Sequence, residues 1–344
     1  MAKNKVTLGV LLQTPDFFQF VRNAVSEGAL GRHVSFKYID NTLLGSKLTD
    51  ELEGVEVLLT DPKLCASVLT KLPKSVKWVQ TTWAGLDYMF SKLNQHDFAN
   101  FEPHFVLTRL GGVFGPVIAD YVLGAVISLE RDWKKQFMAQ SEKKWLTINE
   151  ARNVFQFRSL EQLTVGIIGI GDIGITVAEK LKAAGMRVHG LKRSELKKKE
   201  ERYKAVDELF ISNQLEEFLS RCDYICNTLP HTRDTVNLLS NDVLHVCKAK
   251  KPGLINVGRG TIIDEQCLVK ALNNGWISSA FLDVFTNEPL TPDSPLWEMV
   301  NVTITPHSSG PTQPNFVKEG FLKNLQLYIE NQPLQYVFDW EKGY

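Results

Sequence analysis

The chain has 344 residues, with 39 lysines and arginines balanced by 39 aspartates and glutamates, so its formal net charge at pH 7 is zero. This balance predicts no general attraction to nucleic acid or to an anionic membrane. The hydrophobic content of 44% is ordinary for a globular protein, and no apolar run approaches the ~20 residues that span a membrane. The length exceeds one typical core, so we expect about two domains.

The five cysteines are scattered; Cys222 and Cys226 are separated by three residues, but no partner pair suggests a zinc site. We therefore expect buried, reduced thiols, a cytoplasmic protein and no metal ion. The apolar stretch at 6–12 is too short for the core of a signal peptide and predicts a strand instead.

In the first third of the chain, apolar stretches alternate with helical patterns. Strands are expected over 5–12, 34–39, 54–60, 75–80 and 104–107. A helix should begin near Thr14-Pro15-Asp16 and end at Gly28. Such alternation favours a parallel sheet wrapped by helices.

Two later helical patterns suggest how the domains are connected. Residues 116–129 form a long apolar helix that we expect to pack between two domains, and the polar segment 132–158 should cross into the second domain. A last helix at 313–330 should return to the first domain. The prediction is therefore a discontinuous substrate domain (1–115 and 311–344) and a nucleotide-binding domain (116–310), with hinge helices near 117–130 and 313–330.

The stretch 163–191 reads strand, glycine-rich turn, helix, strand, with GIGDIG at 169–174. In this context Gly169 permits the tight turn, Gly171 admits a pyrophosphate close to the backbone, and Gly174 lets the helix sit near the strand. The free N–H groups at the helix start, near Asp172 and Ile173, would bind the anion. Strands are expected over 165–170 and 186–191, followed by 205–210, 224–228, 254–257, 279–283 and 302–305. Together they predict a doubly wound sheet that binds a dinucleotide.

The end of the second strand of this unit bears on the type of dinucleotide. An NAD site places an acid there to accept the ribose hydroxyls, but no acid occurs from 187 to 194. Lys192 and Arg193 would instead attract a 2′-phosphate, and Ser194 could hydrogen-bond it. We therefore predict that NADP(H) is preferred and that NAD(H) remains possible.

Three polar residues follow later strands of the same sheet. Arg259 stands between two glycines, Glu288 follows the strand at 279–283, and His307 follows the strand at 302–305. Arginine binds a carboxylate bidentately, and a histidine paired with a carboxylate can act as a general acid or base. Each residue alone is as readily a surface or capping residue, so the inference depends on all three lying at strand ends of one sheet.

These motifs resemble the D-isomer-specific 2-hydroxyacid dehydrogenase family over nearly the whole chain. The matching stretches are GIGDIG, LPHT at 229–232, NVGRG at 256–260, LDVFTNEPL at 282–290 and TPHSSG at 305–310. Within the family, the chain is most similar to the glyoxylate/hydroxypyruvate reductase A-like branch. This finer resemblance rests on residues 82–87, Arg109-Leu110 and 337–340. The resemblance implies an α/β fold of two doubly wound parallel-sheet domains, one a Rossmann nucleotide-binding domain and the other a flavodoxin-like substrate domain.

The resemblance also implies roles for particular residues. His307 would give a proton to the carbonyl of a 2-oxo acid, Glu288 would pair with His307, and Arg259 would hold the substrate. Further substrate contacts are expected from Trp83, Ala84 and Gly85. Arg109 either binds the far end of the substrate or is a salt-bridged interdomain arginine. Further cofactor contacts are expected from Leu229, Pro230, Thr235, Val257, Asp283 and His307. Family members are usually dimers, and Trp133 and Trp145 are candidates for that interface.

The leading hypothesis is thus NADPH-dependent reduction of glyoxylate, hydroxypyruvate or a related small 2-oxo acid. Two alternatives remain open on these residues. One is a dehydrogenase for a bulkier D-2-hydroxy acid, and the other is a dinucleotide-sensing protein that acts by binding partners, like corepressors that resemble this family.

Overall fold

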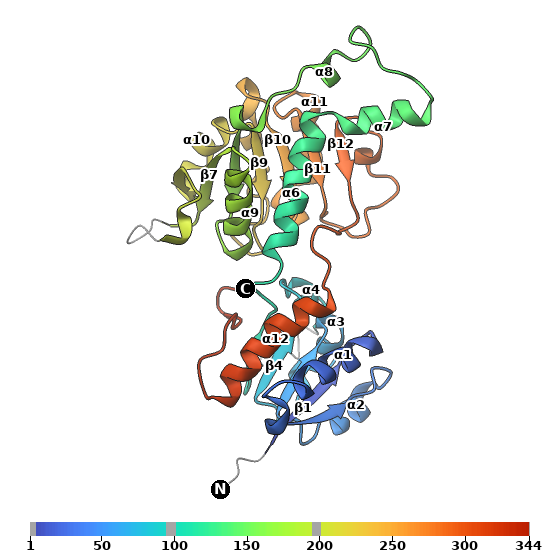
Figure 1. Ribbon diagram of the computed structural model, residues 1–344, viewed down its shortest axis with the longest axis vertical. Helices are drawn as coiled ribbons and strands as arrows, with labels where there is room; N and C mark the ends of the chain where they lie inside the picture. Colours follow the sequence, from blue (N-terminus) through green and yellow to red (C-terminus); the bar gives the residue numbers. More distant parts are fainter. Residues whose placement is uncertain (1–4, 94–100, 195–200, 344) are drawn as a thin grey trace. The chain divides into compact units, whose positions relative to one another are not determined.

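The structure, a computed structural model, describes residues 5–93, 101–194 and 201–343 and divides into two compact units (Figure 1). Unit 1 comprises Met1–Val113 and Thr312–Tyr344, and unit 2 comprises Phe114–Pro311. The segment 132–158 lies entirely within unit 2, so the prediction that it crosses between domains was wrong. Among the described residues, no helix is long and apolar enough to cross a membrane.

Unit 1 is built on a five-stranded parallel sheet with the order β2-β1-β3-β4-β5. Its strands are β1 (Val6–Leu11), β2 (Val34–Tyr38), β3 (Val57–Thr60), β4 (Trp78–Thr81) and β5 (Val106–Thr108). Its helices include α1 (Pro15–Ser26), α2 (Gly45–Glu51), α3 (Pro62–Cys65), α4 (Asp87–Ser91) and α12 (Pro314–Ile329). This strand order is the flavodoxin-like one, as expected from the sequence.

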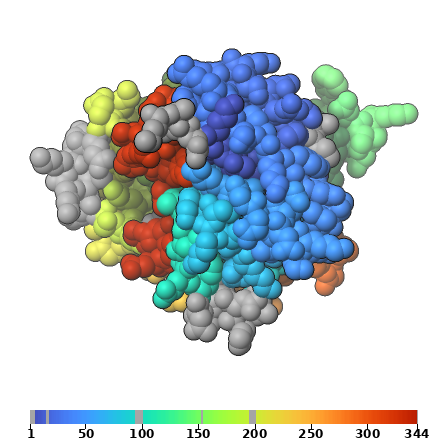
Figure 2. All heavy atoms as spheres, turned by 90° about the horizontal axis from the view of Figure 1, so that it is seen from below, coloured from blue at the N-terminus to red at the C-terminus, as the bar shows by residue number. Residues whose placement is uncertain are grey.

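The C-terminal helix α12 completes unit 1. It contacts α1, and the two helices lie side by side at the face shown in Figure 2. The fully buried Trp78 of β4 stacks on Phe321 of α12, with ring centroids 5.6 Å apart. Burying two large aromatic rings on each other supplies several kcal/mol of hydrophobic and stacking stabilisation, about 2–4 by area. The last helix therefore closes the core of the unit in which the chain begins.

Unit 2 has a seven-stranded parallel sheet with the order β12-β11-β10-β9-β6-β7-β8. Its strands are β6 (Thr164–Ile168), β7 (Arg187–Lys192), β8 (Glu208–Ile211), β9 (Tyr224–Asn227), β10 (Gly253–Asn256), β11 (Ser279–Leu282) and β12 (Val302–Ile304). Counted from β6, this is the Rossmann order 3-2-1-4-5-6 with one added edge strand. Most of these strands are apolar throughout because helices cover both faces of the sheet.

The helices of unit 2 include α6 (Gly115–Glu130), α7 (Trp133–Ser141), α8 (Arg152–Phe155), α9 (Asp172–Ala183), α10 (Leu215–Ser220) and α11 (Glu265–Asn273). The long apolar helix α6 packs along α9 (Figure 1). The approach is closest at Gly115, where a Cβ would lie 2.5 Å from Thr176 Oγ1. The apolar character of α6 is thus explained by packing inside unit 2.

Several element ends differ from the predicted ones. β6 ends at Ile168 rather than at 170 because Gly169, with φ 97°, already turns the chain away from the sheet. Gly185 ends α9 with φ 95°, as its position suggested, whereas Gly28 has no positive φ and α1 ends at Ser26. The five cysteines are free thiols, four of them buried and Cys267 half-buried, which corrects the expectation that all are buried.

Candidate active site

The strand order of unit 2 reverses between β6 and β9, so their loops diverge and leave a crevice at the carboxyl ends of the strands. Five loops meet at this edge, because all seven strands are parallel. The loops after β6, β9, β10, β11 and β12 carry the residues that the sequence singled out in this unit. Each loop contributes a distinct feature.

The glycine-rich turn after β6 leads directly into α9. A Cβ on Gly174 would lie 2.1 Å from the carbonyl oxygen of Gly169, so only glycine allows this contact. A Cβ on Gly171, by contrast, would meet nothing within 4 Å. No side chain of the described residues caps the N-terminus of α9, which begins at Asp172 and continues through Ile173. An uncapped helix start facing open space fits the pyrophosphate of a dinucleotide.

The end of β7 presents Lys192, Arg193 and Ser194. Arg193 is exposed, and its guanidinium lies 3.2 Å from Asp234 in the loop after β9. Since β7 and β9 flank β6, this ion pair spans the carboxyl end of β6. The ammonium group of Lys192 instead lies over the ring of Tyr203, 5.2 Å from its centroid. Two cations thus stand beside the glycine-rich turn.

The loop after β9 holds the cofactor candidates Leu229, Pro230 and Thr235. The Thr235 hydroxyl donates to the Pro230 carbonyl over 2.8 Å, closing the turn. A Cβ on Gly169 would lie 2.8 Å from a Leu229 methyl group, so this loop packs directly on the glycine-rich turn. Val257, which follows β10, is buried beside it.

Two buried asparagines join the loops after β9 and β10. Asn227 donates to Asn256 Oδ1 over 2.9 Å, and Asn227 Oδ1 accepts from the Leu229 N–H at 3.1 Å. Asn256 in turn donates to the carbonyl oxygen of Arg259 over 3.1 Å. Buried amides with satisfied hydrogen bonds make these loops rigid.

The glycines on either side of Arg259 are required by close backbone contacts. A Cβ on Gly258 would lie 2.7 Å from the Leu229 carbonyl oxygen, and a Cβ on Gly260 would lie 1.9 Å from the Phe285 carbonyl carbon. Arg259 itself is half-buried, and its Nη1 donates to the Gly258 carbonyl over 2.8 Å. The NVGRG motif is therefore clamped between its two neighbouring loops.

His307 and Glu288 are brought together from adjacent strand ends. His307 Nδ1 lies 2.7 Å from Glu288 Oε2, and Glu288 Oε1 accepts from the Phe285 N–H at 2.9 Å. Both side chains remain partly exposed. Because Nδ1 faces Glu288, the ring nitrogen left for chemistry is Nε2.

The pKa values of this pair move in opposite directions. The hydrogen bond to Glu288 raises the pKa of His307, although burial and the charge of Arg259 act against it. Burial by itself would raise the pKa of Glu288, but the hydrogen bonds from His307 and the Phe285 N–H outweigh it and lower that pKa. The pair therefore favours an imidazolium beside a carboxylate, which stores a proton at His307.

Asp283 holds the loop that carries His307. It is 0% exposed, and its two carboxylate oxygens accept from the N–H groups of Ser308 and Ser309 at 2.8 and 2.9 Å and from the Thr305 hydroxyl at 2.6 Å. The backbone of His307 has φ 52°, an unfavourable conformation for a non-glycine residue that surrounding contacts must enforce. The hydrogen bonds to Asp283 on either side of His307 hold its backbone in this conformation.

In unit 1, the segment after β4 carries Trp83, Ala84 and Gly85. Among the described residues, no hydrogen bond uses the N–H groups of Ala84 and Gly85 as donors. Neighbouring backbone N–H groups of this kind suit a carboxylate. Arg109 follows β5, and its guanidinium lies over the ring of Tyr336 at 5.2 Å from the centroid.

Sequence reasoning missed several residues of this network: Tyr121, Asn227, Asp234, Asn256 and Thr305. Tyr121 hydrogen-bonds Thr305, which in turn donates to Asp283. Asn227 and Asn256 each end an otherwise apolar strand, and Tyr121 is a polar-tipped residue in an apolar helix. For these residues a polar group in an otherwise apolar element was the signal, since such groups require partners. The exposed Asp234 carried no such signal.

Comparison with known proteins gives consistent matches. A family model described as D-isomer specific 2-hydroxyacid dehydrogenase, NAD binding domain, matches residues 123–309. Glyoxylate/hydroxypyruvate reductase A from Escherichia fergusonii is 30% identical over 273 residues, which is 79% of this chain and 83% of that protein.

Solved structures resemble the chain over almost its whole length. A D-isomer specific 2-hydroxyacid dehydrogenase family protein from Aeromonas salmonicida has a TM-score of 0.80 and 30% identity, covering 98% of this chain and 99% of its own. A D-isomer specific 2-hydroxyacid dehydrogenase from Xanthobacter autotrophicus, in complex with NADPH and MES, has a TM-score of 0.78 and 26% identity. The match covers 99% of this chain and 100% of that one.

Proposed function

Since the chain belongs to the D-isomer-specific 2-hydroxyacid dehydrogenase family and is an NAD(P)-dependent oxidoreductase, we propose that it uses NADPH to reduce a small 2-oxo acid of the glyoxylate or hydroxypyruvate type. The product would be the D-2-hydroxy acid. The observation that carries this proposal is the His307–Glu288 pair, 2.7 Å apart at the same sheet edge as the glycine-rich turn.

The proposed chemistry needs a proton at the carbonyl oxygen of the substrate. The bound nicotinamide supplies the hydride that reaches C2. His307 holds the proton at Nε2, since Nδ1 is engaged by Glu288, and it releases that proton to the oxygen that becomes the hydroxyl. Glu288 keeps the ring in this orientation and stabilises its protonated form.

Substrate binding is assigned to an arginine and to backbone N–H groups. Arg259, held by the Asn256 contact and by the glycines beside it, would polarise the carbonyl and bind the carboxylate. The N–H groups of Ala84 and Gly85, which donate no hydrogen bond among the described residues, would also donate to the carboxylate, with Trp83 beside them. Arg109 is proposed to contact the far end of the substrate.

We propose NADPH as the preferred cofactor. Arg193, Lys192 and Ser194 offer positive charge and a hydroxyl where an NAD enzyme would place an acid. The Xanthobacter relative was crystallised with NADPH, which supports the same choice. Pro230, Thr235, Val257 and Asp283 are proposed cofactor contacts because they line the same edge of the sheet as Gly171.

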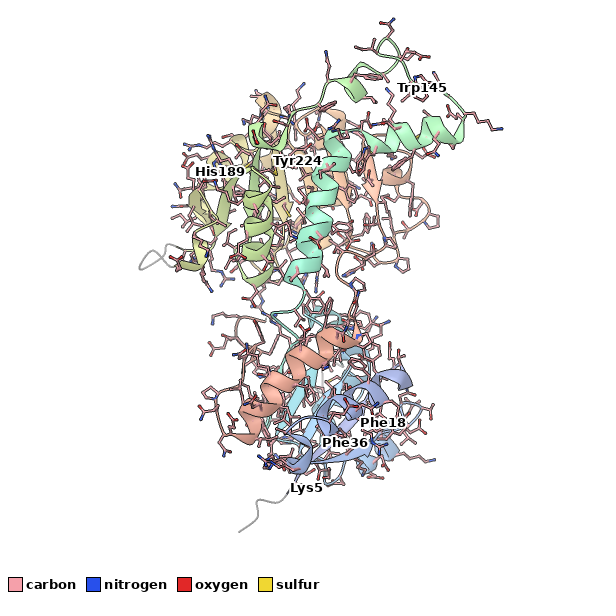
Figure 3. All side chains as sticks on the ribbon, viewed as in Figure 1. Lys5, Phe18, Phe36, Trp145, His189 and Tyr224 are labelled. Atoms are coloured by element: carbon pink, nitrogen blue, oxygen red, sulfur yellow. The ribbon has the colours of Figure 1, made fainter. Side chains whose placement is uncertain are left out.

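We further propose a homodimer formed through the segment that includes α7 and α8. Trp145 is 90% exposed, and Figure 3 shows it on the segment that extends beyond α7. Phe137 and Ile148 of this segment are 62% and 59% exposed. An apolar-lined hollow of about 480 Å³ between α6, α7 and α8 could receive such side chains from a second copy.

A steady-state assay tests the proposed function. Glyoxylate, hydroxypyruvate and bulkier 2-oxo acids are each offered with NADPH, and cofactor oxidation is followed by absorbance. We expect turnover of the small acids and a loss of about 100-fold or more in kcat for His307→Gln. His245→Gln, a substitution at an exposed histidine away from the carboxyl edge, is the control. Failure to reduce any 2-oxo acid would favour the partner-binding alternative, and a preference for bulkier acids would change the substrate class.

A further inference from the structure

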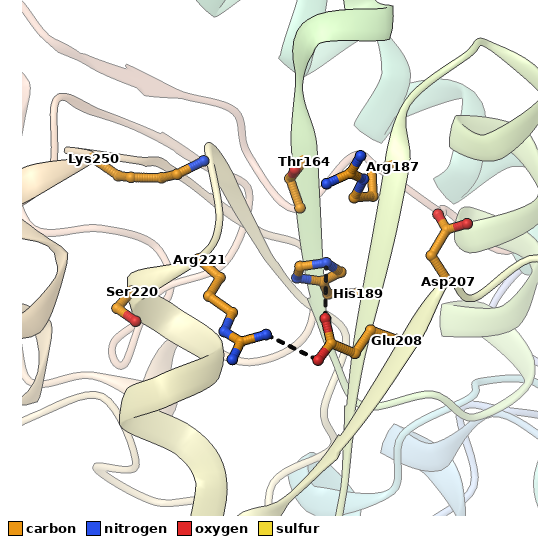
Figure 4. Close-up of a pocket in the computed structure, with 8 residues that line it drawn as sticks. All are labelled: Thr164, Arg187, His189, Asp207, Glu208, Ser220, Arg221 and Lys250. Atoms are coloured by element: carbon orange, nitrogen blue, oxygen red, sulfur yellow. Dashed lines mark hydrogen bonds and ion pairs between the residues drawn. The ribbon is translucent and has the colours of Figure 1, made fainter.

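Unit 2 contains a second polar cavity, of about 500 Å³, that the proposed reaction does not use (Figure 4). It is lined by side chains near the amino-terminal ends of strands, at the sheet edge opposite the glycine-rich turn. Thr164 begins β6, Arg187 begins β7, Glu208 begins β8, and Arg221 follows α10. Asp207, Ser220, Lys250 and His189 complete the lining.

Two lining side chains of this cavity carry polar atoms without a hydrogen-bond partner among the described residues. Arg187 and His189 are two residues apart on β7, so their side chains leave the same face of the strand. Among the described residues, the exposed guanidinium of Arg187 makes no hydrogen bond or ion pair, although its charge helps to lower the pKa of Asp207. His189 is 5% exposed, its Nε2 lies 3.6 Å from Glu208, and its Nδ1 is buried without a hydrogen-bond partner among the described residues.

The two carboxylates of the lining are already engaged. Asp207 accepts from the Val188 N–H at 2.8 Å and from Lys182 at 2.5 Å. Glu208 pairs with Arg221 at 2.9 Å, as the dashed line in Figure 4 marks. Lys250 pairs with Asp223 at 3.2 Å, so Arg187 is the lining lysine or arginine whose side chain has no hydrogen bond or ion pair among the described residues. An exposed guanidinium of this kind, next to the buried and unsatisfied Nδ1 of His189, favours an anionic ligand over a neutral one.

We propose that this cavity binds a phosphate-class oxyanion, either inorganic phosphate or a phosphomonoester, with Arg187 as its principal contact. The planar guanidinium of Arg187 donates two parallel hydrogen bonds to such an anion. Arg221 and Lys250, each paired with a carboxylate, line the same cavity, as do Thr164 and Ser220. The site is separate from the catalytic edge, so it does not depend on which 2-oxo acid is reduced.

His189 provides a local reporter of occupancy. Burial lowers its pKa, and Arg187 and Arg221 act in the same direction, while Glu208 and Asp207 oppose them. A bound anion would offset the two arginine charges and favour the protonated ring, in which both nitrogens can donate. The nitrogen resonances of the His189 ring should then move toward those of an imidazolium.

The test titrates the NADP⁺-saturated enzyme with inorganic phosphate at constant ionic strength. Saturation with NADP⁺ keeps phosphate from the anion sites of the carboxyl edge. We expect calorimetric binding in the wild type, an accompanying shift of the His189 resonances, and affinity at least about tenfold weaker in Arg187→Gln. Arg22→Gln, which removes an exposed arginine of unit 1, should retain phosphate binding at this cavity.

The outcomes separate clearly. Equal phosphate affinity in Arg187→Gln and the wild type, or an equal His189 shift with chloride at the same ionic strength, would overturn the proposal. Arg187→Lys keeps the charge without the bidentate geometry. Its affinity for phosphate should therefore fall between those of the wild type and Arg187→Gln. A parallel titration with phenyl phosphate identifies the source: tighter binding than inorganic phosphate assigns a phosphomonoester, and weaker binding assigns the free ion.

Discussion

His307 Nδ1 and Glu288 Oε2 lie 2.7 Å apart, although 19 residues separate them in the chain. The loops after β11 and β12 bring them together because these strands are neighbours in a parallel sheet. The raised pKa of His307 keeps its proton available to higher pH than an isolated histidine would. Reductive activity should therefore hold at low pH and decline as the pH rises through that value.

Glu288→Gln should move this decline to lower pH, because the amide removes the charge that raises the pKa of His307. We expect kcat to fall about tenfold or more near neutral pH and to recover in part as the pH is lowered. The pH dependence of kcat/KM with NADPH measures the effect. A variant with lower activity but an unchanged pH profile would argue that Glu288 acts only on structure.

Asp283→Asn should disturb the loop that carries His307. An amide offers one acceptor oxygen where the carboxylate offers two, and its NH₂ group would face the N–H of Ser308 or Ser309. We expect a loss of about 1–3 kcal/mol in the free energy of unfolding and a lower kcat. Thermal unfolding and steady-state kinetics check both; unchanged kcat would show that His307 is held by other contacts.

Gly171→Ala should leave the fold intact and impair cofactor binding. The added Cβ meets nothing within 4 Å in the part of the chain that the structure describes, and φ at this position is −96°, which alanine adopts easily. If the open space receives the pyrophosphate, the methyl group will raise the KM for NADPH. Gly124→Ala, also with an open Cβ position but within α6, is the matched control and should leave this KM unchanged.

Arg193→Gln should weaken NADPH binding by about 1.5–3 kcal/mol while leaving NADH binding nearly unchanged, since only NADPH carries the 2′-phosphate. Asp234→Asn should act in the opposite direction. It removes a carboxylate 3.2 Å from Arg193 that would compete with the phosphate. The gain should be several-fold at most because the pair is exposed. Cofactor dissociation constants measure both effects, and a wild-type preference for NADH would contradict the cofactor assignment itself.

Trp145→Ser should weaken self-association if the segment that carries it packs on a second copy. Loss of one large exposed ring from an interface costs about 2 kcal/mol or more when that ring is an anchor. Light scattering over a range of concentrations measures the mass. Trp297→Ser removes a half-exposed tryptophan elsewhere in unit 2 and is the control. A monomeric wild type would refute the dimer.

Much of the fold was predictable because its signals are local. Buried parallel strands appear in the sequence as apolar runs. The GIGDIG motif at a strand–helix junction determines the conformation of the turn between β6 and α9, because Gly169 and Gly174 allow its close contacts. The predicted strands of both sheets are present, but their ends moved by a few residues. The apolar pattern continues into residues such as Ile170, which are buried without belonging to a strand.

The sequence by itself determined the chemical types available: a glycine-rich turn, basic residues after β7, and an arginine, a glutamate and a histidine after later strands. Only the tertiary structure decided how they are held. Three contacts join residues of different loops. His307 lies 2.7 Å from Glu288, the buried Asp283 binds the loop in which His307 has its positive φ, and Gly260 contacts Phe285. These contacts depend on strand order, and strand order is a property of the whole sheet rather than of any local stretch of residues.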